Sequence, residues 1–184
     1  MGRSGLRLLP SSLRKVLREK APSPLWFDNL TREESDNETE LAPLPDSVKK
    51  LIEEKTFANV ATLMPDGSPH VTQTWVDHEG DLVLINTFEG SQKHRNASRD
   101  ARIALDVCDP TSPFHMAVIR GRVKEVTTQG AEEHIDKMAK KYLGQDRYTR
   151  RPGMKRVLIK IEPTRVIAPW EDSPRWKEWN SPQK

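Results

Sequence analysis

The stretch INTFEGSQKHRN, residues 85–96, holds the residue types of this chain that are best suited to binding chemistry. An apolar run gives way there to polar residues, then to Gly90, and then to a basic segment that begins with Ser91. A glycine lets the backbone turn sharply, and a helix that starts after it directs its N–H groups toward one point. Ser91 would add a hydroxyl to that point, and Lys93 a cation. The pattern predicts a phosphate-binding site, with a solvated basic helix face as the alternative.

Other catalytic and metal-binding signatures are missing from the sequence. It contains no GxGxxG, GxxxxGK[ST], GxSxG or HExxH motif, which disfavours the usual dinucleotide fold, nucleoside-triphosphate loop, hydrolase elbow and zinc-peptidase helix. The five histidines show no compact metal-ligand spacing, so we predict no metal site, with a site assembled from distant residues as the alternative. Cys108 is the single cysteine, and we expect it to be a buried, inert thiol.

The elements that must position the phosphate site are mostly strands. Apolar, β-branched runs alternate with short turns such as residues 65–67, and too few residues separate the runs for parallel crossovers. We therefore predict a mostly β fold with helices, of the α+β class, whose six or seven antiparallel strands form a closed or half-closed barrel. The predicted strands cover residues 56–64, 70–76, 82–85, 103–107, 114–126, 157–161 and 165–168, with turns at 78–81 and 109–113 and a break at Pro163.

Three helices complete the predicted domain. The first opens at Asp46 after Pro45, because proline and an acid both suit a first helical turn. The second is the basic segment, which Ser91 can cap. The third is expected to start with Thr128 as its cap and to end at Gly144. Its apolar face is formed by Ile135, Met138, Ala139 and Tyr142.

The ends of the chain differ from its centre. Residues 1–44 combine a basic tail with an acidic linker, and we expect them to be disordered. Residues 45–169 form the barrel domain with the phosphate site, whereas residues 170–184 form a tail with three tryptophans that either covers a dimer partner or ligand or caps the barrel. No apolar run is long enough to span a bilayer, so we predict a cytoplasmic protein without a transmembrane segment.

Several short motifs follow one another in a recognisable order. They are FANVAT (57–62), DGSPH (66–70), NT (86–87), GSQKHRN (90–96) and RDAR (99–102), and Gly121 and YTRRPG (148–153) extend the series. In this order the chain resembles the pyridoxamine 5′-phosphate oxidase-like family of split β-barrels, whose fold is that of FMN-binding proteins. Within the family it is most similar to the deazaflavin-dependent branch, which uses coenzyme F420. The resemblance covers roughly residues 45–168.

The resemblance implies a homodimer with the cofactor in a groove at the subunit interface. Lys93 matches the family's phosphate-binding lysine, and Ser91 and Gln92 flank it. The cofactor ring would lie over the second and third predicted strands. Ordinary strand or core packing is the alternative for Thr72 and Trp75. The ring-contacting positions that the resemblance implies are His70, Val71, Thr72, Gln73 and Trp75, together with Asn86 and Thr87.

The chain departs from the family pattern at two positions. Flavin mononucleotide (FMN) enzymes commonly carry arginine where this chain has Gln92, and many deazaflavin relatives carry arginine where it has Ser91. One cation fewer weakens charge-assisted phosphate binding, unless His94, Arg95 or a residue of the partner subunit replaces it.

The function implied is that of an F420-dependent oxidoreductase that transfers a hydride to or from a small organic acceptor. The alternatives are an FMN-dependent oxidase or reductase of the same fold, and a non-catalytic flavin- or haem-binding protein. We assign no catalytic acid or base, and we expect no nucleic-acid partner because stacking aromatic residues are not interleaved with the basic ones.

Overall fold

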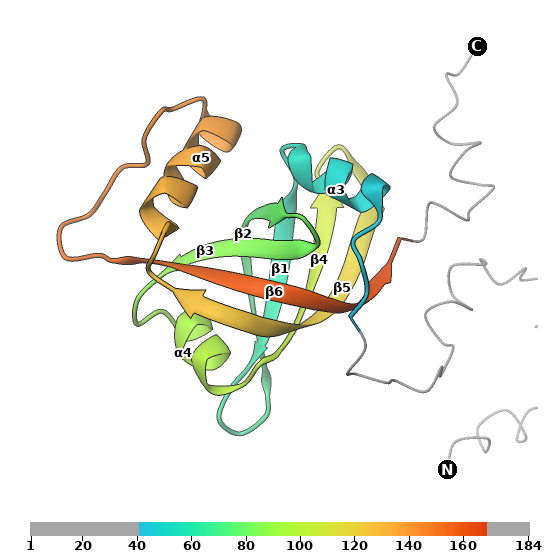
Figure 1. Ribbon diagram of the computed structural model, residues 1–184, viewed down its shortest axis with the longest axis horizontal. Coiled ribbons are helices and arrows are strands. Elements are labelled where there is room, and N and C mark those ends of the chain that lie inside the picture. Colours follow the sequence, from blue (N-terminus) through green and yellow to red (C-terminus); the bar gives the residue numbers. More distant parts are fainter. Residues whose placement is uncertain (1–40, 169–184) are drawn as a thin grey trace, which may run out of the picture. The chain divides into compact units, whose positions relative to one another are not determined.

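Within residues 41–168, which the computed structural model describes, six antiparallel strands close into a barrel in the order β1-β2-β3-β6-β5-β4 (Figure 1). This confirms the predicted antiparallel barrel. The predicted basic tail, the acidic linker up to residue 40 and the tryptophan-containing tail lie outside the described residues. The strands are β1 (Phe57–Leu63), β2 (Pro69–Glu79), β3 (Leu82–Phe88), β4 (Arg102–Asp109), β5 (Ser112–Thr127) and β6 (Arg156–Ile167).

Alternation of side chains along the strands fills the barrel interior. In β1, Ala58, Val60 and Thr62 are buried, whereas the residues between them are half-exposed. Burial of each large apolar side chain stabilises the fold by about 1.5–3 kcal/mol, so the interior accounts for much of the barrel's stability. The fully buried interior residues include Val60, Val76, Val83, Ile85, Val107, Ile119, Ile159 and Ile161.

Three helices pack against the barrel in the described part of the chain: α3 (Asp46–Glu53), α4 (Gln92–Arg99) and α5 (Ala131–Leu143). α3 and α4 lie at opposite ends of the barrel, and α5 packs on β2, β3 and β6 (Figure 1). The predicted cap of α5 is wrong. Gly130, which adopts a left-handed conformation (φ 72°), is its N-cap, and Thr128 lies before that turn. None of the described helices is long and apolar enough to cross a membrane.

The predicted break at Pro163 is also wrong, because β6 runs through it as one strand. Pro163 cannot donate to a ladder, but it lies opposite Gly121, where the register of β5 against β6 shifts between Arg120 and Gly121. The Pro163 carbonyl accepts a hydrogen bond from the Ala42 N–H at 2.9 Å. An irregular ladder thus accommodates the proline without ending the strand.

β2 is longer than predicted. It includes His78 and Glu79, so only Gly80 and Asp81 form the turn to β3. Gly80 has a φ of 61°, which a glycine adopts without strain. The longer strand carries Asp77 and His78 beyond the segment expected from the sequence.

Candidate functional site

The barrel wall is interrupted between β2 and β3. The two strands share only four residue pairs, from Val76 with Ile85 to Glu79 with Leu82. Residues 69–75 of β2 pair only with β1, and residues 86–88 of β3 pair only with β6. We call this interruption the split. It adjoins the first half of β2, the end of β3 and the start of α4, which are the three segments expected to carry the site.

The start of α4 places two hydroxyl groups together. Ser91 is the N-cap, and its Oγ accepts a hydrogen bond from the His94 N–H at 3.2 Å. The Thr87 Oγ1, at the end of β3, lies 2.9 Å from that Oγ. The other N–H groups of the first turn have no partner within the helix, so this end is electropositive. The predicted Ser91 cap is confirmed.

Lys93 is buried without a counter-charge. Its side chain is only 6% exposed and lies on the inner face of α4 with Asn96 and Ala97. No residue between 41 and 168 forms an ion pair or hydrogen bond with its ammonium group, and burial lowers the pKa of Lys93 to about 8. A buried ammonium without a partner is unfavourable, so this position favours an anion.

The first turn of α4 is also tied to β1 and β2. Asn96 Nδ2 donates to Thr62 Oγ1 at 3.0 Å, and Thr62 pairs with His70 across the β1–β2 ladder. Gln92 Nε2 donates to Asn96 Oδ1 at 2.8 Å. These bonds fix the helix against the barrel end at which the split opens.

Arg95 lies at the exposed side of the same turn. Its guanidinium donates to the Gly90 carbonyl and to Gln92 Oε1. Neither acceptor carries a charge. These bonds therefore place the guanidinium of Arg95 beside the start of the helix without neutralising it, where the sequence lacks the arginine expected at position 92 or 91.

The predicted ring-contacting residues of β2 lie on two faces. His70 and Thr72 pair with Thr62 and Val60, which are buried, so they face the barrel interior. Val71 and Gln73 lie on the outer face and are exposed, Val71 by 58%. The Thr72 hydroxyl is buried and forms no hydrogen bond with the described residues. Of these four residues, only Val71 and Gln73 can contact a flat ring on the outer face through their side chains.

Trp75 belongs to an aromatic cluster with Tyr142 and Tyr148. It stacks on Tyr142 with ring centroids 5.0 Å apart and an angle of 4° between the rings, and the Tyr148 ring meets its edge at 5.8 Å. The Arg156 guanidinium lies 4.4 Å from the Tyr148 centroid. Burial raises the pKa of Tyr142 to about 12, and its hydroxyl accepts from the Val76 N–H at 3.2 Å. Trp75 is thus held rigidly on the outer face beside Val71 and Gln73.

Asn86 is separated from the start of α4, although Thr87 follows it directly. It is 7% exposed, and its Nδ2 donates to the Ala131 carbonyl of α5 at 2.7 Å. His134 Nδ1 lies 3.4 Å from the same nitrogen. Alternation along β3 therefore points Asn86 toward α5 and Thr87 toward Ser91.

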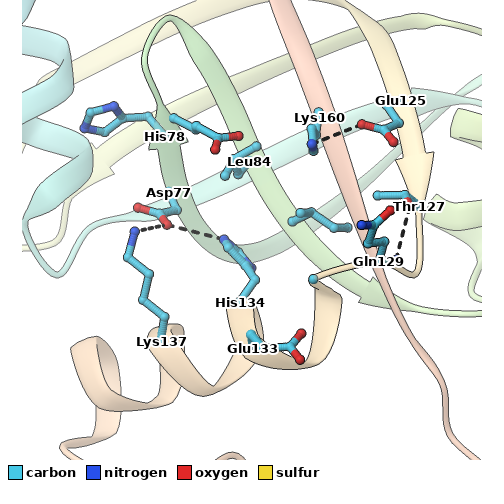
Figure 2. Close-up of a pocket in the computed structure, with 13 residues that line it drawn as sticks. Asp77, His78, Leu84, Glu125, Thr127, Gln129, Glu133, His134, Lys137 and Lys160 are labelled. Carbon is cyan, nitrogen blue, oxygen red and sulfur yellow. Dashed lines mark hydrogen bonds and ion pairs between the residues drawn. The ribbon is translucent and has the colours of Figure 1, made fainter.

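A second hollow, of about 580 Å³, lies between α5 and the outer face of the sheet (Figure 2). None of the eleven predicted site residues lines it. Asp77 and His134 lie at its base, with Asp77 Oδ2 2.5 Å from Lys137 Nζ and 3.4 Å from His134 Nε2. Burial acts to raise the pKa of Asp77, but the nearby His134 and the bond from Lys137 outweigh it and lower the pKa to about 2. Asp77, His134 and Lys137 connect α5 to β2.

Sequence reasoning missed this group because its members lie far apart in the chain and on different elements. Asp77 falls beyond the predicted end of β2, and His134 reads as one more polar residue of an amphipathic helix. His134 precedes the buried Ile135 and follows the buried Ala131 by three residues, and that spacing was the available signal.

Asp77→Asn is expected to make stability less dependent on pH. The folded pKa of Asp77 lies below its unfolded value of 3.8, so its contribution is present above pH 4 and is lost as pH falls toward 2. After allowance for solvent screening the contribution is about 1–2 kcal/mol. Urea unfolding at pH 7 and at pH 3 would measure it. The variant should be less stable than the wild type at pH 7, and the gap should shrink to about half at pH 3 because the folded pKa lies lower still. Asp146→Asn, at an exposed ion pair, should match the wild type throughout.

Comparison with known proteins supplies independent evidence. The family model for pyridoxamine 5′-phosphate oxidase matches residues 44–168. A solved structure described as an F420 reductase is 27% identical, with a TM-score of 0.59, and the match covers 67% of this chain and 98% of that chain. None of the curated proteins matches this chain.

Two more distant structures support the fold alone. HupZ from Group A Streptococcus is 22% identical with a TM-score of 0.52, over 68% of this chain and 93% of that one. A conserved hypothetical protein of Mycobacterium tuberculosis, Rv2991, is 21% identical with a TM-score of 0.52, over 70% of this chain and 85% of that one. Each aligns with most of its own length to this barrel.

Proposed function

Because the chain belongs to the pyridoxamine 5′-phosphate oxidase family, we propose that it is an oxidoreductase that binds coenzyme F420 and exchanges a hydride with a small organic acceptor. The family consists generally of flavin-binding oxidoreductases with this barrel fold. F420 is favoured over FMN because the relative described as an F420 reductase is 27% identical and matches over 98% of its length.

The observation that carries the proposal is the buried side chain of Lys93, whose ammonium group has no counter-charge among residues 41–168. A phosphate beside it would supply the missing counter-charge and would raise the pKa of Lys93 back toward its ordinary value. The Ser91 and Thr87 hydroxyls and the N–H groups of α4 would add hydrogen bonds at the same point. Arg95 would contribute charge from the exposed side, and Gln92 would keep the turn in place.

The ring of the cofactor would lie at the split, on the outer face of β2. Val71 and Gln73 would contact it there, and Trp75 would close one side because the stack on Tyr142 fixes its position. The bound cofactor supplies the hydride chemistry, and the protein supplies position and electrostatics. His70 and Thr72 would support the strand from inside the barrel, and Asn86 would hold β3 to α5.

We also propose that two copies of the chain form a homodimer with the cofactor at their interface. Members of this family are often dimeric. The exposure of Val71 on the outer face is consistent with this, because an apolar side chain gains from being covered. A mass measured by light scattering near twice 21.1 kDa would support the dimer, and a mass near 21.1 kDa would rule it out.

Side-by-side equilibrium titration with F420 and with FMN tests the cofactor. Trp75 lies at the proposed ring position, so quenching of tryptophan fluorescence should accompany binding. Tighter binding of F420 is the expected result. Tighter binding of FMN would favour the second candidate, an FMN-dependent oxidase or reductase. The same site could serve it, because FMN also carries a phosphate. Binding of neither would contradict an oxidoreductase role for this site.

Ser91→Ala is expected to have two separable effects. Loss of the N-cap bond to His94 should lower the free energy of unfolding by about 1 kcal/mol. Loss of a hydroxyl donor at the proposed phosphate position should weaken F420 binding by a further ~1 kcal/mol, about fivefold. Ser98→Ala, at an exposed position of the same helix, is the control and should change neither urea unfolding nor F420 titration. Unchanged affinity in Ser91→Ala would remove Ser91 from the site.

A further inference from the structure

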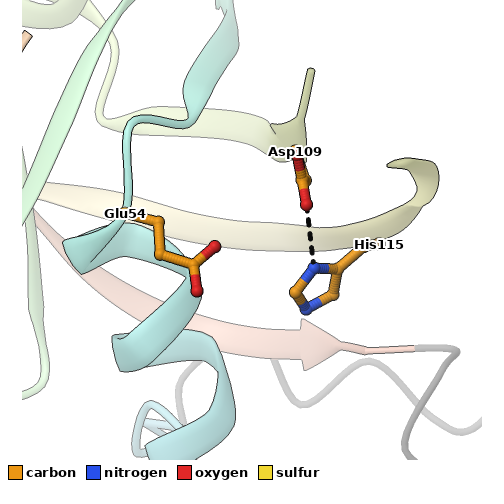
Figure 3. A group of neighbouring side chains, drawn as sticks. All are labelled: Glu54, Asp109 and His115. Atoms are coloured by element: carbon orange, nitrogen blue, oxygen red, sulfur yellow. Dashed lines mark hydrogen bonds and ion pairs between the residues drawn. The ribbon is translucent and has the colours of Figure 1, made fainter. Parts of the chain in front are cut away.

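Three side chains with metal-binding atoms meet near the C-terminal end of α3 (Figure 3). They are Glu54, Asp109 and His115, and each offers one ligand atom within 4.8 Å of the other two. They come from the C-cap of α3, the end of β4 and the start of β5, so only the fold assembles them. None of them belongs to the proposed cofactor site.

Asp109 is held with one oxygen directed at His115. Its Oδ1 accepts hydrogen bonds from the Thr111 N–H at 2.8 Å and from the Thr111 Oγ1 at 2.7 Å. Its Oδ2 lies 3.4 Å from His115 Nδ1.

His115 and Glu54 approach from the two other elements. His115 lies on the same face of β5 as the buried Ala117, which turns its ring toward α3. Glu54 is the C-cap of α3, with its backbone N–H bonded to the Lys50 carbonyl and its side chain exposed. The backbone of Glu54 is thus fixed, while its carboxylate can adjust toward the other two ligand atoms.

We propose that Glu54, Asp109 and His115 bind one divalent transition-metal ion, with Zn²⁺ as the best match. One imidazole and two carboxylates form a donor set that Zn²⁺ accepts in proteins. Zinc bonds of about 2.0–2.1 Å in a tetrahedron place neighbouring ligand atoms roughly 3.3 Å apart. The 3.4 Å between Asp109 Oδ2 and His115 Nδ1 is long for a hydrogen bond and close to that tetrahedral edge.

A bound ion would neutralise two carboxylates and would join α3 to the β4–β5 hairpin. Three protein ligands leave a fourth position for water. The Glu53–His78 pair provides a matched comparison, because Glu53 precedes Glu54 directly and lies 3.2 Å from His78 Nε2. That pair contains only one carboxylate and should bind the ion far more weakly.

Zinc titration of the tag-free full chain after treatment with a chelator tests the site. Isothermal calorimetry should give one Zn²⁺ per chain, and Glu54→Gln and His115→Ala should each weaken binding at least tenfold. Asp109→Asn should do the same while keeping an oxygen for the Thr111 bonds, which guards against loss of the fold. Glu53→Gln and His78→Gln should bind zinc as the wild type does, and Mg²⁺ should compete poorly.

Thermal unfolding and a cobalt spectrum provide readouts that do not depend on catalysis. Zn²⁺ should raise the melting temperature of the wild type by several degrees and leave that of His115→Ala unchanged. Absence of stoichiometric binding, or equal affinity in wild type and Glu54→Gln, would overturn the proposal. A cobalt–thiolate band would also overturn it, since Cys108 would then be a ligand. F420 affinity should be the same in His115→Ala and wild type, so failure here leaves the proposed function unaffected.

Discussion

Lys93→Met is expected to weaken F420 binding by about 1.5–3 kcal/mol, which is roughly a 10- to 100-fold rise in Kd. The loss follows from removing the charge that would face the phosphate, while methionine keeps most of the buried length of the side chain. Lys155→Met, at a side chain that is 75% exposed, should bind F420 as the wild type does. Fluorescence titration of the three proteins measures the difference. Equal affinity of Lys93→Met and wild type would exclude Lys93 from the cofactor site.

The same variant is expected to be more stable than the wild type without cofactor. Burial lowers the folded pKa of Lys93 to about 8, below its unfolded value of 10.5. Below pH 8 the folded state must therefore keep a proton on a buried, unpaired ammonium, and this costs about 2–3 kcal/mol. As pH rises from 8 to 10.5 the unfolded state still holds the proton and the folded state does not, so the cost disappears.

Urea unfolding at pH 7 and at pH 10 measures this stability difference. At pH 7 the free energy of unfolding of Lys93→Met should exceed that of the wild type by up to about 2–3 kcal/mol. The difference should be smaller at pH 10. A variant that is less stable than the wild type at pH 7 would mean that the ammonium has a compensating partner. A residue that lowers stability in the free protein and raises affinity for a ligand is characteristic of a binding site.

Gly121→Ala is expected to destabilise the barrel by about 2–4 kcal/mol. A Cβ at this position would lie 2.5 Å from the Glu162 carbonyl oxygen and 2.8 Å from the Ile161 Cγ2. The first of these atoms is backbone, so β5 and β6 would have to separate at the irregular register opposite Pro163. The φ of Gly121 is not positive, so the cost comes from close approach and not from backbone conformation.

Gly153→Ala is the matched control for Gly121→Ala. Gly153 has a φ of 77° and open space around its Cα, so the added methyl group costs only conformational strain, about 1 kcal/mol. Urea unfolding at neutral pH compares the two variants. A loss in Gly121→Ala no larger than that in Gly153→Ala would show that the two strands adjust without cost.

Local sequence patterns were sufficient for most of the fold. The Ser91 cap, the Gly144 helix end and the short turns between apolar runs depend on neighbouring residues, and the structure confirms them. The prediction at Pro163 failed because the outcome there depends on a distant strand, whereas the prediction at Thr128 overlooked the nearby Gly130. A register shift on β5 accommodates Pro163, and the left-handed Gly130 displaces the start of α5 past Thr128.

The candidate site was harder to predict from the sequence than the fold. It depends on which side chains are buried and on which face of a strand each side chain lies. Nothing local to Lys93 indicates that it lacks a counter-charge, since that follows from how α4 packs on the barrel. Alternation along a strand was available as a signal, and it separates Val71 and Gln73 from His70 and Thr72. The prediction that the whole β2 segment contacts the ring ignored this alternation.

The most direct test of the central claim is a crystal structure of the full chain with F420 bound. We expect the F420 phosphate within about 2.7–3.0 Å of Lys93 Nζ, at the start of α4, with Ser91 Oγ also in hydrogen-bond reach. We also expect the deazaflavin ring on the outer face of β2 beside Trp75. A phosphate bound elsewhere, for example in the hollow between α5 and the sheet, with Lys93 still without a counter-charge, would disprove the proposed cofactor site.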